Sequence, residues 1–255
     1  MADLFTLHGQ HALVTGASSG LGRHFAGVLA RAGARVSLGA RREGALAQTV
    51  EAVREAGGEA QGFALDVTRA DAIERALDGA EAALGPVTIL VNNAGIAATK
   101  AALDLDEAGW DEVIDTNLKG VWLTAQGAAR RMVAHGVAGS IVNVASILGL
   151  RVAGGVAPYA VSKAGVVQLT KALALEWARH RIRVNALAPG YIETELNADF
   201  FAGEAGQALM KRVPQRRLGR AAELDGPLLL LASAAGSYMT GAVVAVDGGH
   251  LVSSL

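Results

Sequence analysis

The segment Ala12-Leu-Val-Thr-Gly-Ala-Ser-Ser-Gly-Leu-Gly22 decides the fold. It starts with a short apolar run typical of a buried strand, and helical periodicity begins near residue 20. Gly16, Gly20 and Gly22 occupy the junction between the two. Such a turn presents free backbone N–H groups and the positive end of a helix dipole, which together favour a phosphate. The segment therefore predicts nucleotide binding, with a tight strand-to-helix connection as the alternative.

The rest of the chain repeats this alternation of short strands and longer helices. We expect strands at 12–15, 35–39, 60–65, 88–91, 140–144, 182–186 and 242–246, and helices near 20–32, 42–56, 69–84, 106–135, 159–180 and 221–235. Thr68, with Asp71 three residues later, predicts an N-cap. Most strands are apolar without alternation, as in strands covered on both faces. The predicted fold class is α/β: a single doubly wound Rossmann-type domain over residues 1–255, with a mostly parallel seven-stranded sheet and helices on both faces.

Composition excludes several classes of function. Lys and Arg number 23 against 24 Asp and Glu, a net charge of −1, which gives no basic surplus for nucleic acid. The chain has no cysteine, and its six histidines show no metal-binding spacing, so we expect no metal. Neither a signal peptide nor a membrane-spanning apolar run is evident. These features predict a cytoplasmic protein with no membrane partner.

One long segment interrupts the alternation. From Pro189 to Pro214 there is no clear period, and Phe200 and Phe201 stand side by side. Loops of this length inside a compact domain are usually functional, and ligands of open α/β sheets bind at the carboxyl ends of the strands. We therefore predict a substrate lid near 190–213. The alternative is a small helical excursion packed by its own Phe, Leu and Met side chains.

The end of the second strand indicates which dinucleotide binds. NAD-binding proteins usually carry Asp or Glu there, whereas this chain has Gly39-Ala40-Arg41-Arg42. A small residue followed by a guanidinium suits a 2′-phosphate, so we predict NADP(H), recognised by Arg41. NAD(H) is the alternative cofactor. Ser19 lies where a second basic residue would have strengthened the preference, and both arginines could instead be solvated.

Two shorter motifs follow later strands. Asp66-Val67 ends the third strand, where a carboxylate can accept from an adenine amino group, and Asn92-Asn-Ala-Gly95 ends the fourth with small residues beside a flat ligand. The alternatives are a helix-start acid for Asp66 and a strand-tying side chain for Asn92.

The fifth strand leads to three residues with acid–base potential: Ser146, Tyr159 and Lys163. Tyr159 and Lys163 are four residues apart, so they lie on one face of a helix. An ammonium beside a phenol lowers the pKa of the tyrosine toward neutrality, where it can act as a general acid or base. Ser146 can hydrogen bond the substrate oxygen. A solvated Tyr–Lys pair is the alternative.

With these residues the chain resembles the short-chain dehydrogenase/reductase family over essentially its whole length. The resemblance rests on Thr15–Gly22, Asn92–Gly95, Asn117 within Asp-Thr-Asn-Leu-Lys, Ser146, Tyr159-Ala-Val-Ser-Lys163, Pro189-Gly190 with Thr194, and Val246–Gly249. It implies an oxidoreductase that transfers a hydride between a nicotinamide cofactor and a carbonyl or secondary alcohol.

The family's site residues carry over by motif. Asn117, Ser146, Tyr159 and Lys163 would form the catalytic tetrad, with Asn117 in a locally broken helix that holds a relay water, and Lys163 bonded to the nicotinamide ribose. Thr194 would contact the carboxamide, although a helix N-cap is the competing role. The implied cofactor site comprises Gly16, Ser18, Ser19, Gly20, Leu21, Gly22, Arg41, Asp66, Val67, Asn93, Ala94, Gly95, Tyr159, Lys163, Pro189, Gly190, Ile192 and Thr194.

The helix that starts at Tyr159 is apolar almost all round, so it must be buried on several sides. Association through it is plausible, and the family resemblance implies a homotetramer. The alternative is deep burial within a monomer.

The substrate is the least determined feature. The predicted substrate-binding residues are Ser146, Leu148, Tyr159 and Tyr191, with Ile147, Leu150, Ala97, Ala98, Leu196, Phe200 and Phe201 as further pocket candidates. These are mostly apolar and no buried charge is evident, which favours a neutral ketone or secondary alcohol.

Two other functions compete with this one. A 3-oxoacyl reductase acting on an acyl carrier protein or CoA thioester needs a basic docking patch near the site, for which Arg130-Arg131 and the group Arg179, Arg181 and Arg183 are candidates. A non-catalytic dinucleotide-binding regulator would keep the fold, but usually without the Tyr or Lys that this chain retains.

Overall fold

A seven-stranded parallel sheet organises the described part of the chain, residues 4–194 and 198–253 of a computed structural model. The strands are β1 (His11–Thr15), β2 (Arg35–Ala40), β3 (Ala60–Ala64), β4 (Ile89–Asn92), β5 (Gly139–Val144), β6 (Ile182–Pro189) and β7 (Val243–Val246). They lie in the order β3-β2-β1-β4-β5-β6-β7, and every neighbouring pair is parallel. The predicted α/β fold class and its seven strands are confirmed.

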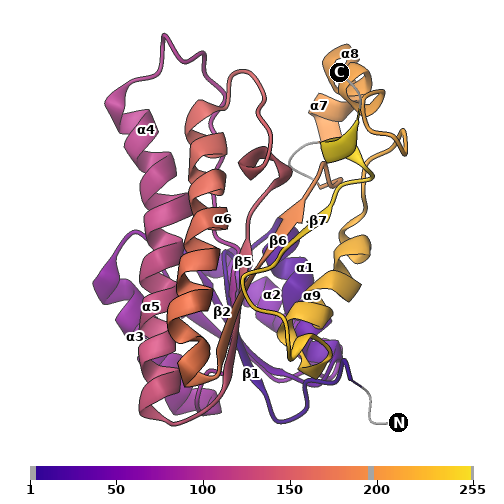
Figure 1. Cartoon of the computed structure of the whole chain (residues 1–255). Helices are drawn as coiled ribbons and strands as arrows, with labels where there is room; N and C mark the ends of the chain where they lie inside the picture. Colours follow the sequence, from indigo (N-terminus) through magenta and orange to yellow (C-terminus); the bar gives the residue numbers. More distant parts are fainter. Residues whose placement is uncertain (1–3, 195–197, 254–255) are drawn as a thin grey trace.

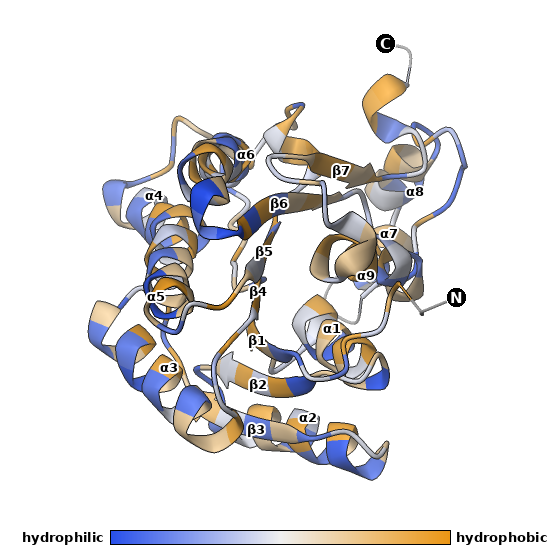
Figure 2. Ribbon diagram, turned by 60° about the horizontal axis from the view of Figure 1, so that its bottom comes forward, coloured by the Kyte–Doolittle hydropathy of each residue, from blue (hydrophilic) through white to orange (hydrophobic). Residues whose placement is uncertain are grey.

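Helices cover both faces of this sheet (Figures 1 and 2). One face carries α1 (Gly20–Arg31), α2 (Glu43–Glu55) and α9 (Asp225–Ala232), and the other carries α3 (Ala70–Leu84), α4 (Glu107–Ile114), α5 (Gly120–Ala134) and α6 (Ala157–Trp177). Two short helices, α7 (Ala198–Ala202) and α8 (Glu204–Met210), lie beyond the carboxyl ends of the strands (Figure 1). Short 3-10 turns occur at Ile147–Gly149, Ala178–His180, Ala221–Leu224, Ala234–Gly236 and His250–Val252.

The core consists of two apolar layers, one on each face of the sheet. Phe25, Leu38 and Leu228 are fully buried in the layer below α1, α2 and α9. Leu77, Met132 and Ile141 are fully buried in the layer below α3, α5 and α6. The chain leaves β1 toward β2 and β3 on one side and returns to β4 on the other, so a crevice opens between the carboxyl ends of β1 and β4.

Two helix boundaries differ from the sequence-based prediction. The helix expected over 106–135 is interrupted by a π-helical turn, Asp115–Lys119, which joins α4 to α5. Thr68 is not the N-cap of α3, because its N–H and its hydroxyl both donate to the Asp66 carboxylate, at 3.0 and 2.7 Å. The N-cap is Arg69, and Asp71 lies in the first turn as predicted.

The segment predicted as a lid is partly helical. It contains α7 and α8, which agree with the alternative of a small helical excursion. Phe201 is 6% exposed and Phe200 is 53% exposed, so only one of the paired phenylalanines is buried. Leu196, a pocket candidate, lies outside the described residues, as do two neighbouring positions of this segment, 195 and 197.

Membrane and metal features are absent from the described residues. Within 4–194 and 198–253, no helix combines the length and the apolar character needed to cross a membrane. The same residues contain no group of three or more His, Asp or Glu side chains arranged to hold a metal ion.

Candidate active site

A cleft of about 520 Å³ lies at the carboxyl ends of the central strands. Every predicted cofactor-binding residue except Gly22 lines it, as do Ser146 and Tyr191. The cleft is also lined by residues that the sequence analysis did not single out as ligands: Ala40, Arg42, Leu65, Ile96, Thr116, Val144 and Ala145. Most of them are immediate sequence neighbours of predicted site residues at the strand ends. They could have been predicted from that adjacency.

The glycine-rich turn lies against the loop that follows β4. A Cβ added to Gly16, whose φ is +68°, would lie 2.8 Å from the Ala94 Cα atom. A Cβ on Gly22 would lie 2.3 Å from the Gly16 carbonyl oxygen, so Gly22 is required for packing rather than for lining the cleft. The Asn93 side chain secures the contact by donating to the Thr15 carbonyl at 3.0 Å. This close backbone approach, at the N-terminus of α1, fits a pyrophosphate.

Two arginines lie at the end of the cleft expected to hold the adenosine ribose. Arg41 lines the cleft, and its charge contributes to lowering the pKa of Asp66. Arg42 lines it too, and its Nη2 atom donates to the hydroxyls of Ser19 and Ser18, at 2.6 and 3.1 Å. Arg41 was predicted from the sequence to recognise the 2′-phosphate, whereas Arg42 is the arginine fixed beside the phosphate loop.

Asp66 and Asn92 both have structural partners. Burial opposes ionisation of Asp66, but hydrogen bonds from Thr68 outweigh it and lower the pKa of this carboxyl group, which also lines the cleft. Asn92 is buried and donates to the Asn143 side chain at 3.0 Å, which ties β4 to β5. The strand-tying role of Asn92 is therefore confirmed.

Ser146, Tyr159 and Lys163 meet in the cleft. Ser146 follows β5, and its hydroxyl accepts from the Leu148 N–H at 3.1 Å. Lys163 is 4% exposed, its Nζ donates to the Val144 carbonyl at 2.7 Å, and it lies 5.6 Å from the centre of the Tyr159 ring. Tyr159 lies in the first turn of α6, directly after the proline at the start of the helix, and shares a hydrogen bond with Ser146.

The pKa of Tyr159 is not lowered as the sequence analysis expected. Burial raises the pKa of the Tyr159 phenol, and its hydrogen bond with Ser146 opposes this only in part. Burial also lowers the pKa of Lys163 to about 8. The expected effect of Lys163 on Tyr159 is wrong for this geometry, because the ammonium faces the Val144 carbonyl and desolvation of the phenol dominates.

Asn117 lies in the π-helical turn, fully buried behind the cleft. Its Oδ1 accepts from the Ile96 N–H and its Nδ2 donates to the Ile96 carbonyl, both at 2.8 Å. The break in the helix that the family resemblance implied at Asn117 is therefore present. The side chain does not line the cleft but fixes the backbone of a residue that does.

The predicted substrate residues divide into two groups. Ser146, Tyr159 and Tyr191 line the cleft, and Tyr191 packs against Phe201 and His250 with ring centres 5.6 and 5.4 Å apart. Leu148, in the 3-10 turn at 147–149, does not line the cleft, so its prediction as a substrate residue is not supported. Of the further pocket candidates, Ala97 lines the cleft.

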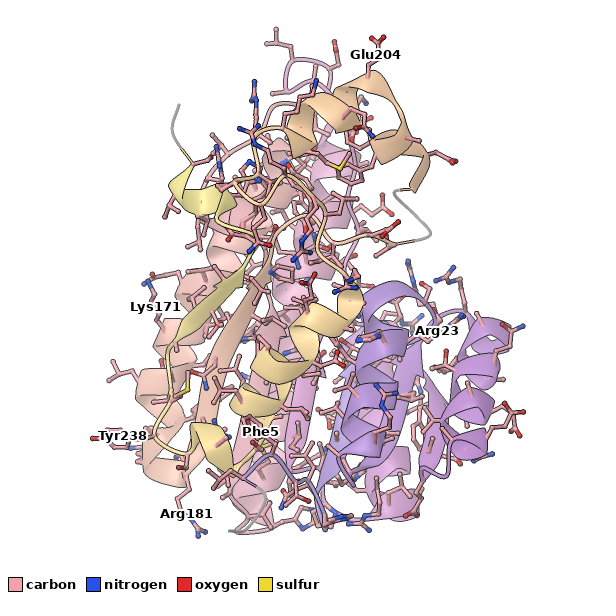
Figure 3. All side chains as sticks on the ribbon, turned by 90° about the vertical axis from the view of Figure 1, so that its right-hand side faces the viewer. Phe5, Arg23, Lys171, Arg181, Glu204 and Tyr238 are labelled. Atoms are coloured by element: carbon pink, nitrogen blue, oxygen red, sulfur yellow. The ribbon has the colours of Figure 1, made fainter. Side chains whose placement is uncertain are left out.

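The arginine groups considered for a carrier protein lie away from the cleft. Arg181 precedes β6, at the end of the molecule opposite Glu204 of α8 (Figure 3). Arg183 donates to the carbonyls of Leu231 and Ser233, at 2.9 and 3.1 Å. Arg131 forms ion pairs with Glu74, Asp78 and Glu81. These arginines do not border the cleft.

The fold and the cleft define a dinucleotide-binding α/β enzyme, and comparison with known proteins assigns its family. A family model described as short chain dehydrogenase matches residues 10–205. The chain is 40% identical over 252 residues to gluconate 5-dehydrogenase of Gluconobacter oxydans (strain 621H), with 98% of each chain covered. It is 43% identical over 252 residues to galactitol 2-dehydrogenase (L-tagatose-forming) of Cereibacter sphaeroides, again with 98% of each covered.

A solved structure agrees with this assignment. The crystal structure of a gluconate 5-dehydrogenase from Burkholderia cenocepacia J2315, in complex with NADP and tartrate, has a TM-score of 0.94 and 38% identity, with 99% of each chain covered. The chain belongs to the short-chain dehydrogenase/reductase family and is an oxidoreductase of that class. The resemblance found in the sequence is confirmed.

Proposed function

We propose that this protein is an NADP(H)-dependent oxidoreductase that interconverts a secondary alcohol and a ketone on a polyhydroxylated carbon chain. The observation that carries the proposal is the meeting of Ser146, Tyr159 and Lys163 in the same cleft as the glycine-rich turn. The named relatives support the substrate class, since C5 of gluconate and C2 of galactitol are both secondary carbinols.

The residues of the cleft fit NADP(H). The Gly16 turn leaves no room for a side chain and suits a pyrophosphate, and Arg41 and Arg42 offer guanidinium groups for a 2′-phosphate. A solved relative that contains NADP supports the same cofactor. When bound, the nicotinamide supplies or accepts the hydride.

The side chains of this protein would handle the proton. Tyr159 would give a proton to the substrate oxygen or take it away, and Ser146, which shares a hydrogen bond with Tyr159, would hold that oxygen beside the phenol. Lys163, fixed by the Val144 carbonyl, would donate to the nicotinamide ribose. Asn117 would position the loop after β4 through its two bonds to Ile96.

The segment near 190–213 would act as the lid of this site. The base of the cleft is lined by Tyr191, Ile192 and Thr194. The ring of Tyr191 packs against that of the buried Phe201, which belongs to α7. The short helices are also packed by their own residues, since a Cβ on Gly206 would meet the Phe200 carbonyl at 2.3 Å.

Exposed apolar side chains support the association expected from the sequence. Leu175 on α6 is 83% exposed and Val161 on the same helix is 48% exposed, and Trp122 of α5 is also exposed. A single chain leaves these side chains in water, so a homotetramer that covers α5 and α6 accounts for them. Mass measurement in solution tests this part of the proposal.

The experiment that tests the function is a set of initial rates. We expect NADPH consumption with polyhydroxylated ketones, and NADP⁺ reduction with gluconate or galactitol. A 3-oxoacyl thioester serves as the comparison. Faster turnover of the thioester would favour the carrier- or CoA-linked reductase, whereas NADPH binding without turnover of any carbonyl compound would favour a regulator.

A further inference from the structure

Arg151 does not line the cleft itself, but its charge acts on Tyr191, which does line it, and most of its side-chain donors have no partner among the described residues. Arg151 follows Ser146 by five residues, and its backbone N–H donates to the Ile147 carbonyl at 2.9 Å, which continues the turn after β5. The side chain is half-buried. Within 4–194 and 198–253, no carboxylate lies within ion-pair distance of its guanidinium.

The C-terminal segment fixes one side of this guanidinium. Nη1 of Arg151 donates to the His250 carbonyl and, at 3.4 Å, to the Ser253 hydroxyl, which itself donates to the His250 carbonyl at 2.9 Å. Every hydrogen bond from the Arg151 side chain to another described residue is donated by Nη1. A guanidinium has five N–H donors, so those on Nε and Nη2 have no partner among the described residues, and their fork matches a carboxylate.

Tyr191 connects this cation to the candidate catalytic residues. Its ring lies 5.4 Å from the ring of His250, whose carbonyl Arg151 holds, and it lines the cleft with Ser146 and Tyr159. Burial raises the pKa of Tyr191 and the Arg151 charge opposes the rise, so the guanidinium acts electrostatically on this phenol. Arg151 is therefore next to Tyr191, which lines the cleft, and does not line the cleft itself.

We propose that Arg151 binds the carboxylate of a polyhydroxylated acid, with Tyr191 lining the path from the cleft to the guanidinium. This inference rests on the proposed function and specifies its substrate as an acid that carries the carboxylate at some distance from the reacting carbinol. It differs from the sequence-based expectation of a neutral substrate. A half-buried cation with no counter-ion among the described residues is stabilised when an anionic ligand supplies one.

The competing account is purely structural: Arg151 would only fasten the C-terminal turn. In that case its loss would disturb acidic and neutral substrates equally, because the turn supports Tyr191 whichever molecule is bound. D-gluconate and galactitol make a suitable pair of probes, since both are six-carbon polyols and one carries a carboxylate.

The test compares KM and kcat for these two probes, with NADP⁺, in the wild type, Arg151→Gln, Arg151→Lys and Ser253→Ala. We expect Arg151→Gln to raise KM for gluconate by about tenfold or more, with KM for galactitol changed less than about twofold. Arg151→Lys keeps the charge and should lie between the wild type and the glutamine variant. Ser253→Ala removes one contact of the C-terminal turn and should match the wild type.

The outcomes separate this inference from the proposed function. Equal losses for both probes, or an unchanged KM for gluconate in Arg151→Gln, would overturn the carboxylate site while leaving the oxidoreductase intact. If Arg151→Gln fails to fold, the KM comparison is made with Arg151→Lys instead. The NADPH affinity of that variant is the control for correct folding. Absence of wild-type turnover with both probes would overturn the proposed substrate class and the Arg151 site together.

Discussion

Asn117 binds both backbone hydrogen-bonding groups of Ile96, accepting from its N–H and donating to its carbonyl at 2.8 Å each. The two residues are 21 positions apart, and the contact fixes the loop after β4 to the π-helical turn between α4 and α5. Ile96 lines the cleft, so this pair links the helix layer to the cofactor site.

Replacing Asn117 by alanine should therefore affect stability and cofactor binding together. Both Ile96 groups would lose their partner, which costs roughly 2–3 kcal/mol in the free energy of unfolding. Urea unfolding measures this loss, and titration with NADPH should show weaker binding. An unchanged unfolding midpoint in Asn117→Ala would show that the loop does not depend on this side chain.

Arg42 should contribute to the preference for NADPH over NADH. Its Nη2 is held by Ser18 and Ser19 at the phosphate loop, and a charge-assisted bond is worth about 1.5–3 kcal/mol. Arg42→Ala should lower kcat/KM for NADPH by about ten- to a hundredfold and leave NADH nearly unchanged. Arg41→Ala removes the other guanidinium proposed for the 2′-phosphate, and the two losses for NADPH are compared. Equal effects on both cofactors would assign Arg42 to local structure.

Lys163 should make cofactor affinity depend on pH. Burial lowers its pKa to about 8, so the side chain loses its charge within an accessible range. If the protonated form binds the ribose hydroxyls, NADPH affinity should fall as pH rises through that value, and the fall should be absent in Lys163→Met. Parallel profiles for the two proteins would show that another group titrates.

His11 should make folding stability fall in mild acid. It is fully buried, its Nδ1 donates to the Gly85 carbonyl at 2.7 Å, and its Nε2 accepts from the Ser37 hydroxyl at 2.8 Å. Burial lowers its pKa below 6.5; the Gly85 bond and the charges of Glu81 and Glu59 oppose this lowering, whereas the Arg35 charge adds to it. The folded state thus binds fewer protons than the unfolded state just below 6.5, and the free energy of unfolding decreases as pH falls.

Urea unfolding of the wild type and His11→Gln between about pH 7 and 5 measures this contribution, because carboxylates titrate mainly below that range. The glutamine variant should be less stable at pH 7 and show a flatter profile. An identical slope in both proteins would mean that His11 does not carry the dependence.

Much of the fold was predictable because its signals are local. Apolar runs predicted the seven strands, and the glycine-rich turn placed the cofactor cleft at the end of β1. The π-helical turn at 115–119 was implied only by the family resemblance at Asn117, because the apolar period of the helix continues through it. Thr68 is not an N-cap because its hydroxyl donates to the nearby Asp66 carboxylate. The sequence pattern of an N-cap does not take such a competing acceptor into account.

The features of the site that were not predicted depend on the direction of a side chain or on contacts between residues far apart in the sequence. Arg41 and Arg42 are adjacent in a turn, where no periodicity indicates which of them faces Ser19. The proposed carboxylate site rests on a contact between Arg151 and His250, which are 99 positions apart, so no local pattern connects them. Burial is the main cause of the raised pKa of Tyr159, and the sequence does not show it. The four-residue spacing to Lys163 indicated only that a positive charge lies nearby.

The proton-transfer role of Tyr159 is the central claim, and Tyr159→Phe tests it most directly. Removing the hydroxyl should lower kcat for NADPH-dependent ketone reduction by about 10²–10⁴-fold, the usual contribution of a positioned general acid. The NADPH dissociation constant, measured on the same samples, should remain within about threefold of wild type, because the ring is retained. Near-wild-type turnover in Tyr159→Phe, with cofactor bound, would contradict the mechanism.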